Sequence, residues 1–143
     1  MNAFSALHHL GSRRIAVDSD SVLATKLEDG GLAIALWNYA PAGGSGPTYT
    51  RQSGVPGQSR DFVVQLDHSG KMHSVTILRV DSTHGSSLAL FDQMGRPDNL
   101  TRDQIANLQK AGVLAPPERT TMKDGRVSIS VPPYGLVVLL IHR

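Results

Sequence analysis

Two runs of the sequence, residues 32–39 and 136–141, are apolar on both faces of the strand that each would form. In the first run, Leu32, Ile34 and Leu36 alternate with Ala33, Ala35, Trp37 and Tyr39. A strand with one face in water alternates apolar and polar residues instead. Both runs therefore predict strands that are covered on both sides.

Six further runs have strand character. They lie at residues 14–18, 22–28, 60–68, 73–81, 119–123 and 126–131. About eight short strands with frequent turn residues between them are typical of an antiparallel architecture. We therefore expect a mainly β protein, an antiparallel β-sandwich, that forms a single domain over residues 1–143.

Three turns join neighbouring runs into expected hairpins. Asp29-Gly30, Gly70 and Asp124-Gly125 each lie between two successive runs. Asp and Gly tolerate the positive φ that tight hairpin turns require. Each pair of runs is thus expected to form neighbouring antiparallel strands.

Two short helices are expected around residues 86–111, within a helical insert at residues 86–112. The second helix has the clearer pattern, because Thr101 and Gln104 form a capping box and Gly112 ends the helix. Either these two helices or a partner domain would supply the second cover of the apolar strands. A large apolar patch that remained exposed would indicate an interface.

Residues 41–59 are rich in Gly, Ser and Pro and contain few residues to bury. We expect a long flexible loop there, and loops of this length are either functional or mobile. One alternative is a mobile surface loop. The other is a loop that reaches a partner surface or a ligand cleft.

Composition excludes several classes of function. The 143 residues include 14 basic and 12 acidic side chains, and a net charge of +2 does not predict binding to nucleic acid or to a membrane. No apolar run approaches the roughly 20 residues of a membrane span. The N-terminal residues lack the pattern of a signal peptide. We expect a soluble protein, and the lack of cysteine does not indicate a compartment.

The titratable residues do not form a recognisable catalytic or metal site. Glu28 and Glu118 are the only glutamates, and the aspartates lie mostly at turns, strand ends and a helix start. His68 and His73 flank a turn, but zinc needs three protein ligands in catalytic sites and four in structural ones. We therefore predict no catalytic residue, no metal and no cofactor.

Aromatic side chains are the candidates for binding. Trp37, Tyr39 and Tyr49 are expected to contact either a protein interface or a sugar, because aromatic rings are large contact surfaces in both settings. Trp37 lies within a strongly apolar strand, which favours packing in a core or an interface.

Four segments together resemble one known family. Ser21 to Lys26 with Gly31 to Pro41 is similar to the region after the catalytic barrel of family 39 glycoside hydrolases, the β-xylosidases. Residues 4–15 resemble the helix and turn that lead into that region, so residues 1–12 are a lead-in segment. Met94-Gly95-Arg96-Pro97 with Thr101 to Ile105 resembles a helical insert, and residues 132–139 resemble the terminal strand.

This resemblance implies an accessory domain. Members of the family have a (β/α)8 barrel with two catalytic glutamates in a retaining mechanism, and only their C-terminal β-sandwich matches this sequence. No catalytic residue carries over. In the family the sandwich packs on the barrel, which would cover the apolar strands and lie near residues 41–59. A split gene, an excised fragment and a fold that stands alone are the three origins left open.

Three interpretations follow. The leading one is a non-catalytic structural domain that resembles part of a β-xylosidase and is not an enzyme on its own, with a (β/α)8 catalytic domain as its partner. The second is a stand-alone carbohydrate-binding module for xylo-oligosaccharides. The third is a protein-interaction domain that self-associates through an apolar face.

Overall fold

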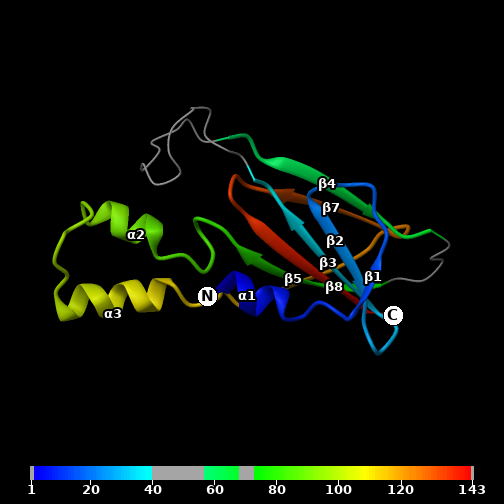
Figure 1. Cartoon of the computed structure of the whole chain (residues 1–143), viewed down its shortest axis with the longest axis horizontal. Helices are drawn as coiled ribbons and strands as arrows, with labels where there is room; N and C mark the ends of the chain where they lie inside the picture. Colours follow the sequence, from blue (N-terminus) through cyan, green and yellow to red (C-terminus); the bar gives the residue numbers. More distant parts are fainter. Residues whose placement is uncertain (1, 40–56, 68–72, 143) are drawn as a thin grey trace.

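A computed structural model describes residues 2–39, 57–67 and 73–142 of the chain. Within these residues, eight strands form two antiparallel sheets, and two of the three helices lie next to one another on one side of the sheets (Figure 1). The prediction of a mainly β, sandwich-like protein with about eight strands is confirmed. Most of the predicted loop 41–59 and the turn at Gly70 lie outside the described residues.

The elements have the following bounds in chain order: α1 (Asn2–Leu7), β1 (Arg13–Ile15), β2 (Val22–Lys26), β3 (Leu32–Trp37), β4 (Arg60–Gln65), β5 (Ser74–Val80), α2 (Leu88–Gln93), α3 (Arg102–Ala111), β6 (Glu118–Thr121), β7 (Arg126–Val131) and β8 (Leu136–His142). Helix α1 belongs to the predicted lead-in segment. Helices α2 and α3 belong to the predicted helical insert.

The larger sheet has six strands in the order β1-β2-β3-β8-β5-β6, and the smaller sheet consists of β4 and β7. Strands β3 and β8 are central neighbours, with Ala35 opposite Val138 in their register. These are the two runs that are apolar on both faces. Their central position explains the pattern, because both faces of a central strand are shielded by the layers above and below it.

The inner face of the large sheet packs against the small sheet. Leu36, Val137 and Leu139 belong to this core, which also contains Ile129 and Val131 of β7. Val137 and Leu139 are completely buried. This layer is therefore the main hydrophobic core of the sandwich, and burial of apolar area is its chief source of stability.

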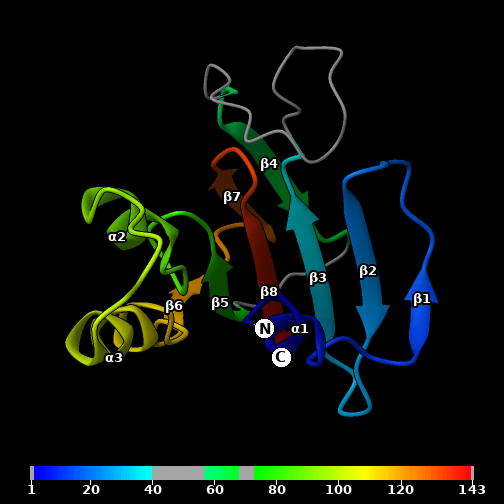
Figure 2. The same ribbon diagram turned by 60° about the vertical axis from the view of Figure 1, so that its left-hand side comes forward.

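The outer face of the same sheet is covered by α1. Ala6 of α1 is completely buried and packs with Ala35, Leu78 and Val138, with Leu7 and Leu10 at the edge of the cluster. Figure 2 shows this helix at one end of β8, and its strand contacts are mainly with β5 and β8. The second cover of the apolar strands within the described residues is thus the lead-in helix, and the two helices of the insert do not supply it.

The first expected hairpin is confirmed and the second is wrong. Strand β2 pairs with β3 around the Asp29-Gly30 turn. Strands β4 and β5, however, lie in different sheets. Strand β4 buries only alternate residues such as Phe62 and Val64, so it suits the two-stranded sheet with one face in water. Strand β5 buries Val75 and Ile77 on one face and Leu78 on the other, and it lies next to β8.

The third expected hairpin is correct only at its turn. Lys123 and Arg126 form a bridge around Asp124 and Gly125, whose φ angles are 52° and 70°. Beyond this bridge the strands separate, because β6 pairs with β5 and β7 pairs with β4. The turn therefore carries the chain from one sheet to the other.

The helical insert has the predicted capping. The Thr101 side chain accepts a hydrogen bond from the Gln104 backbone, and the Gln104 side chain accepts one from Thr101. The side-chain amide of Asn2 donates hydrogen bonds to the carbonyl oxygens of Gly85 at 2.6 Å and Gly112 at 2.5 Å. One side chain of the lead-in segment thus holds both ends of the insert.

Truncation of the inner core should destabilise the domain strongly. We expect Leu139→Ala to lower the free energy of unfolding by about 2–5 kcal/mol, because it removes buried methyl groups and leaves a cavity. Urea denaturation followed by circular dichroism measures this change. The exposed Val63 on β4 is the control site, and Val63→Ala should cost less than about 1 kcal/mol. Equal losses in the two variants would contradict this assignment of the core.

Candidate functional site

The structure separates the three aromatic residues that the sequence singled out. Trp37, the last residue of β3, is half-buried and packs against the outer cluster under α1. Tyr39 lies two residues further on and is 75% exposed. Tyr49 lies outside the described residues. Trp37 therefore contributes to the core, whereas Tyr39 faces the surroundings.

Tyr39 forms a pair with Tyr134, which the sequence analysis did not select. Their ring centroids are 6.2 Å apart and the ring planes meet at 87°, an edge-to-face arrangement. Tyr134 is 59% exposed, so the contact between the rings covers only part of each residue. We call these two residues the tyrosine pair.

The backbone holds the tyrosine pair in place at one end of the sandwich. The Tyr134 amide donates to the Asn38 carbonyl oxygen at 2.8 Å, and the Asn38 amide donates to the Gly135 carbonyl oxygen at 3.1 Å. The buried Asn38 side chain donates to the carbonyl oxygens of Val131 and Gln58 at 3.0 and 2.9 Å. The turn between β7 and β8 is thus joined to the end of β3.

Tyr134 adopts a conformation that is unusual for its side chain. Its φ is 57°, in the left-handed region that costs bulky residues roughly 1–2 kcal/mol. The next residue, Gly135, has no room for a side chain, because a Cβ there would lie 2.8 Å from the Pro132 carbonyl oxygen. The sequence signal for this site was the Pro132-Pro133-Tyr134-Gly135 turn.

Charged residues lie at the same end of the sandwich. The Arg60 guanidinium donates to the Ser21 hydroxyl at 2.6 Å and lies 3.9 Å from the Asp20 carboxylate. Arg60 opens β4 opposite Val131, and the Ser21 carbonyl accepts from the Trp37 amide at 3.1 Å. The end that carries the tyrosine pair therefore also carries hydrogen-bonding groups of both charges.

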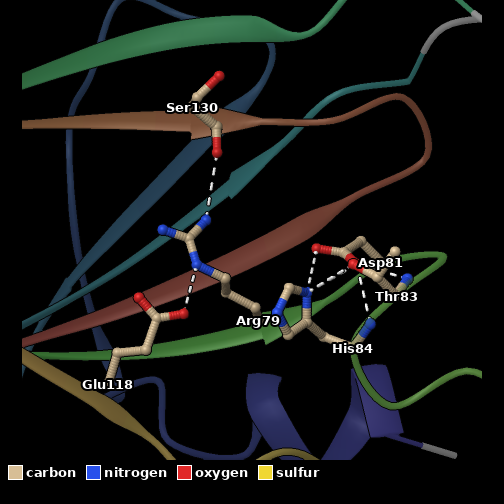
Figure 3. Close-up of polar contacts among 6 residues, drawn as sticks. All are labelled: Arg79, Asp81, Thr83, His84, Glu118 and Ser130. Carbon is tan, nitrogen blue, oxygen red and sulfur yellow. Dashed lines mark hydrogen bonds and ion pairs between the residues drawn. The ribbon is translucent and has the colours of Figure 1, made fainter.

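A second polar group ties the two sheets together. The Arg79 guanidinium donates to Glu118 at 2.8 Å and to the Ser130 carbonyl oxygen at 3.2 Å, so it connects β5 and β6 to β7 (Figure 3). Only 20% of the Arg79 side chain is exposed. Glu118, one of the two glutamates of the sequence, therefore serves as an ion-pair partner.

Asp81 organises the loop that follows β5. Its carboxylate accepts hydrogen bonds from the backbone and hydroxyl of Thr83, each at 2.8 Å, and from the backbone of His84 at 2.9 Å. The His84 ring nitrogen Nδ1 lies 2.9 Å from the same carboxylate, as Figure 3 shows. Burial alone raises the pKa of Asp81, but the hydrogen bonds from Thr83 and His84 outweigh it and lower the pKa.

The loop should lose stability in acid. A carboxyl with a lowered pKa in the folded state stabilises it above the unfolded value, about 3.9 for Asp, and this contribution disappears as the pH falls further. We expect Asp81→Asn to cost about 1–3 kcal/mol at pH 7. The difference from the parent should shrink between about pH 5 and pH 2. Urea midpoints across this range measure it, with Asp61→Asn, on the exposed face of β4, as the control.

The two glutamates do not face one another. Glu28 follows β2 and Glu118 lies on β6, and three other strands separate these two in the sheet. At about 4.8 Å per strand, the lateral separation is roughly 19 Å. Glycosidases hold their two carboxyl groups about 5–9.5 Å apart. The geometry of this pair therefore does not suit glycoside hydrolysis.

Residues 2–39, 57–67 and 73–142 contain no group of three or more potential metal ligands. None of the helices in these ranges is long and apolar enough to cross a bilayer. A hollow at the far end of β4 and β7 includes Gln65, Lys123 and Arg126, but the Arg126 guanidinium is hydrogen-bonded to Gln65 at 2.8 and 3.2 Å.

Solved structures with this fold belong to larger enzymes. A monomeric β-xylosidase from Caulobacter crescentus CB15 matches with a TM-score of 0.74 and 17% identity over 98% of this chain. The GH39 enzyme from Xanthomonas axonopodis pv. citri matches with a TM-score of 0.67 and 23% identity over 98%. A GH39 β-xylosidase from Caulobacter crescentus matches with a TM-score of 0.66 and 19% identity over 99%.

The likeness covers only part of those enzymes. The chain spans 29%, 29% and 27% of their respective lengths. No family model matches the sequence, and neither does any curated protein. The chain thus has the fold of one part of glycoside hydrolases of family 39, the family that the four sequence segments resemble. At these identities the likeness establishes the fold alone.

Proposed function

We propose that this chain is a non-catalytic accessory β-sandwich of a β-xylosidase-like enzyme and that its partner is a (β/α)8 catalytic domain. The observation that carries the proposal is the coverage of the fold match. Nearly the whole chain superposes on enzymes more than three times its length. The remaining part of such an enzyme would contain the chemistry.

The carboxylates support this division of labour. The Glu118 carboxylate accepts a hydrogen bond from the Arg79 guanidinium at 2.8 Å. Glu28 follows β2, and three strands of the sheet lie between β2 and the β6 strand of Glu118. Removing either glutamate should therefore affect packing or solubility, and not the making or breaking of a glycosidic bond.

The outer face of the large sheet supports a partner. Helix α1 buries Ala35 and Val138 completely, but Trp37, Leu136 and Leu140 around them remain half-buried. Phe4, on α1 itself, is 80% exposed. Apolar side chains that remain accessible around a covered centre are suited to contact with a second protein surface. Self-association through this face stays an alternative prediction.

The chain alone should not hydrolyse nitrophenyl β-xyloside. We expect release of nitrophenol at the rate of buffer, because the two glutamates lie too far apart for acid–base and nucleophilic roles. The measurement is absorbance over hours, with a family 39 β-xylosidase as the positive control. Turnover that survives purification and disappears in Glu28→Gln or Glu118→Gln would refute the proposal.

Genomic context provides the test of the partner. We expect a reading frame for a (β/α)8 barrel next to this one or continuous with it.

Co-expression of this chain with such a barrel should give a single complex on size-exclusion chromatography. Phe4→Asp should weaken that complex, whereas Val63→Asp, an equally drastic change on exposed β4, should leave it intact. Separate elution of the two proteins would contradict the proposed partner.

A further inference from the structure

We propose that the tyrosine pair, Tyr39 and Tyr134, is a binding site for a pyranose oligosaccharide, in which a sugar unit stacks on one ring and contacts the other. The site lies at the end of the sandwich where β3 ends and the β7–β8 turn begins. The choice of a xylo-oligosaccharide as ligand rests on the proposed function. The aromatic geometry is independent of the proposed function, because it follows from the described residues alone.

The exposed rings match the chemistry of a sugar. The C–H groups on a pyranose face carry partial positive charge, and the π-face of an aromatic ring is negative. Tyr39 and Tyr134 are 75% and 59% exposed, so much of their surface is accessible to a ligand. With ring planes at 87° and centroids 6.2 Å apart, the pair forms a corner. A sugar unit in this corner can stack on one ring and contact the other.

The conformation of Tyr134 supports a functional role for its ring. Its φ of 57° is one that glycine adopts without strain and a bulky side chain does not. Two other non-glycine residues among those described have positive φ, Arg96 and Asp124, and neither is aromatic. Such strain is found preferentially at functional sites.

The site is also organised before any ligand arrives. Hydrogen bonds of 2.8 and 3.1 Å join the backbone of the turn to Asn38, whose own side chain is buried and bonded twice. Hydrogen bonds that hold the backbone next to both rings reduce the ordering that binding would require. Asp20 and Arg60, at the same end of the sandwich, are groups of the kind that bind sugar hydroxyls.

Titration of the 143-residue chain with xylotriose tests the proposal. The measurement is a series of ¹⁵N–¹H correlation spectra up to about 10 mM sugar, which detects millimolar affinity. We expect saturable shifts at the backbone amides of Asn38, Tyr39, Tyr134 and Gly135. Tyr39→Ala and Tyr134→Asn should each weaken binding by about tenfold or more. Asn tolerates the left-handed conformation, so the second variant removes the ring without adding strain.

The control is Phe4→Ala, which removes the exposed aromatic ring of α1 and should leave the affinity unchanged. Melting curves of all variants establish that each one is folded. The absence of shifts up to the highest xylotriose concentration would overturn the proposal, as would binding of equal strength in the tyrosine variants. Neither outcome affects the proposed accessory role, which depends on the hydrolysis and co-expression experiments.

Discussion

The antiparallel pairing of β3 with β8 determines where the small sheet and helix α1 pack. These two strands lie side by side at the centre of the six-stranded sheet, and each is apolar on both faces. The small sheet covers one face and α1 covers the other. Because burial of apolar surface is the dominant favourable term in folding, both covering layers follow from this central pair.

The same pairing places the tyrosine pair. Strand β8 begins opposite the end of β3, with Leu136 opposite Trp37. The residues just beyond this register must therefore meet, and they are Asn38 and Tyr39 on one side and Tyr134 and Gly135 on the other. An exposed aromatic corner thus lies directly beyond the two central strands of the sheet.

Local patterns predicted the elements better than their partners. The capping box of α3, the β2–β3 hairpin and the turn at Asp124-Gly125 depend on residues a few positions apart, and all three are present. The pairing of β4 with β5 was wrong, although a turn residue separates them in the sequence. The choice of sheet depends on which faces a strand can bury. Strand β4 exposes Asp61 and Val63, whereas β5 buries residues on both faces.

The candidate site shows the same division. The residue pattern alone indicates that Tyr39 follows an apolar strand, that the chain has two glutamates far apart in the sequence, and that strands 32–39 and 136–141 need two covers. Long-range packing establishes that α1 supplies the second cover, that Tyr134 contacts Tyr39, and that Glu118 binds Arg79. Tyr39 and Tyr134 are 95 positions apart, and no local pattern connects them. Their meeting depends on the register of two strands, which long-range packing sets.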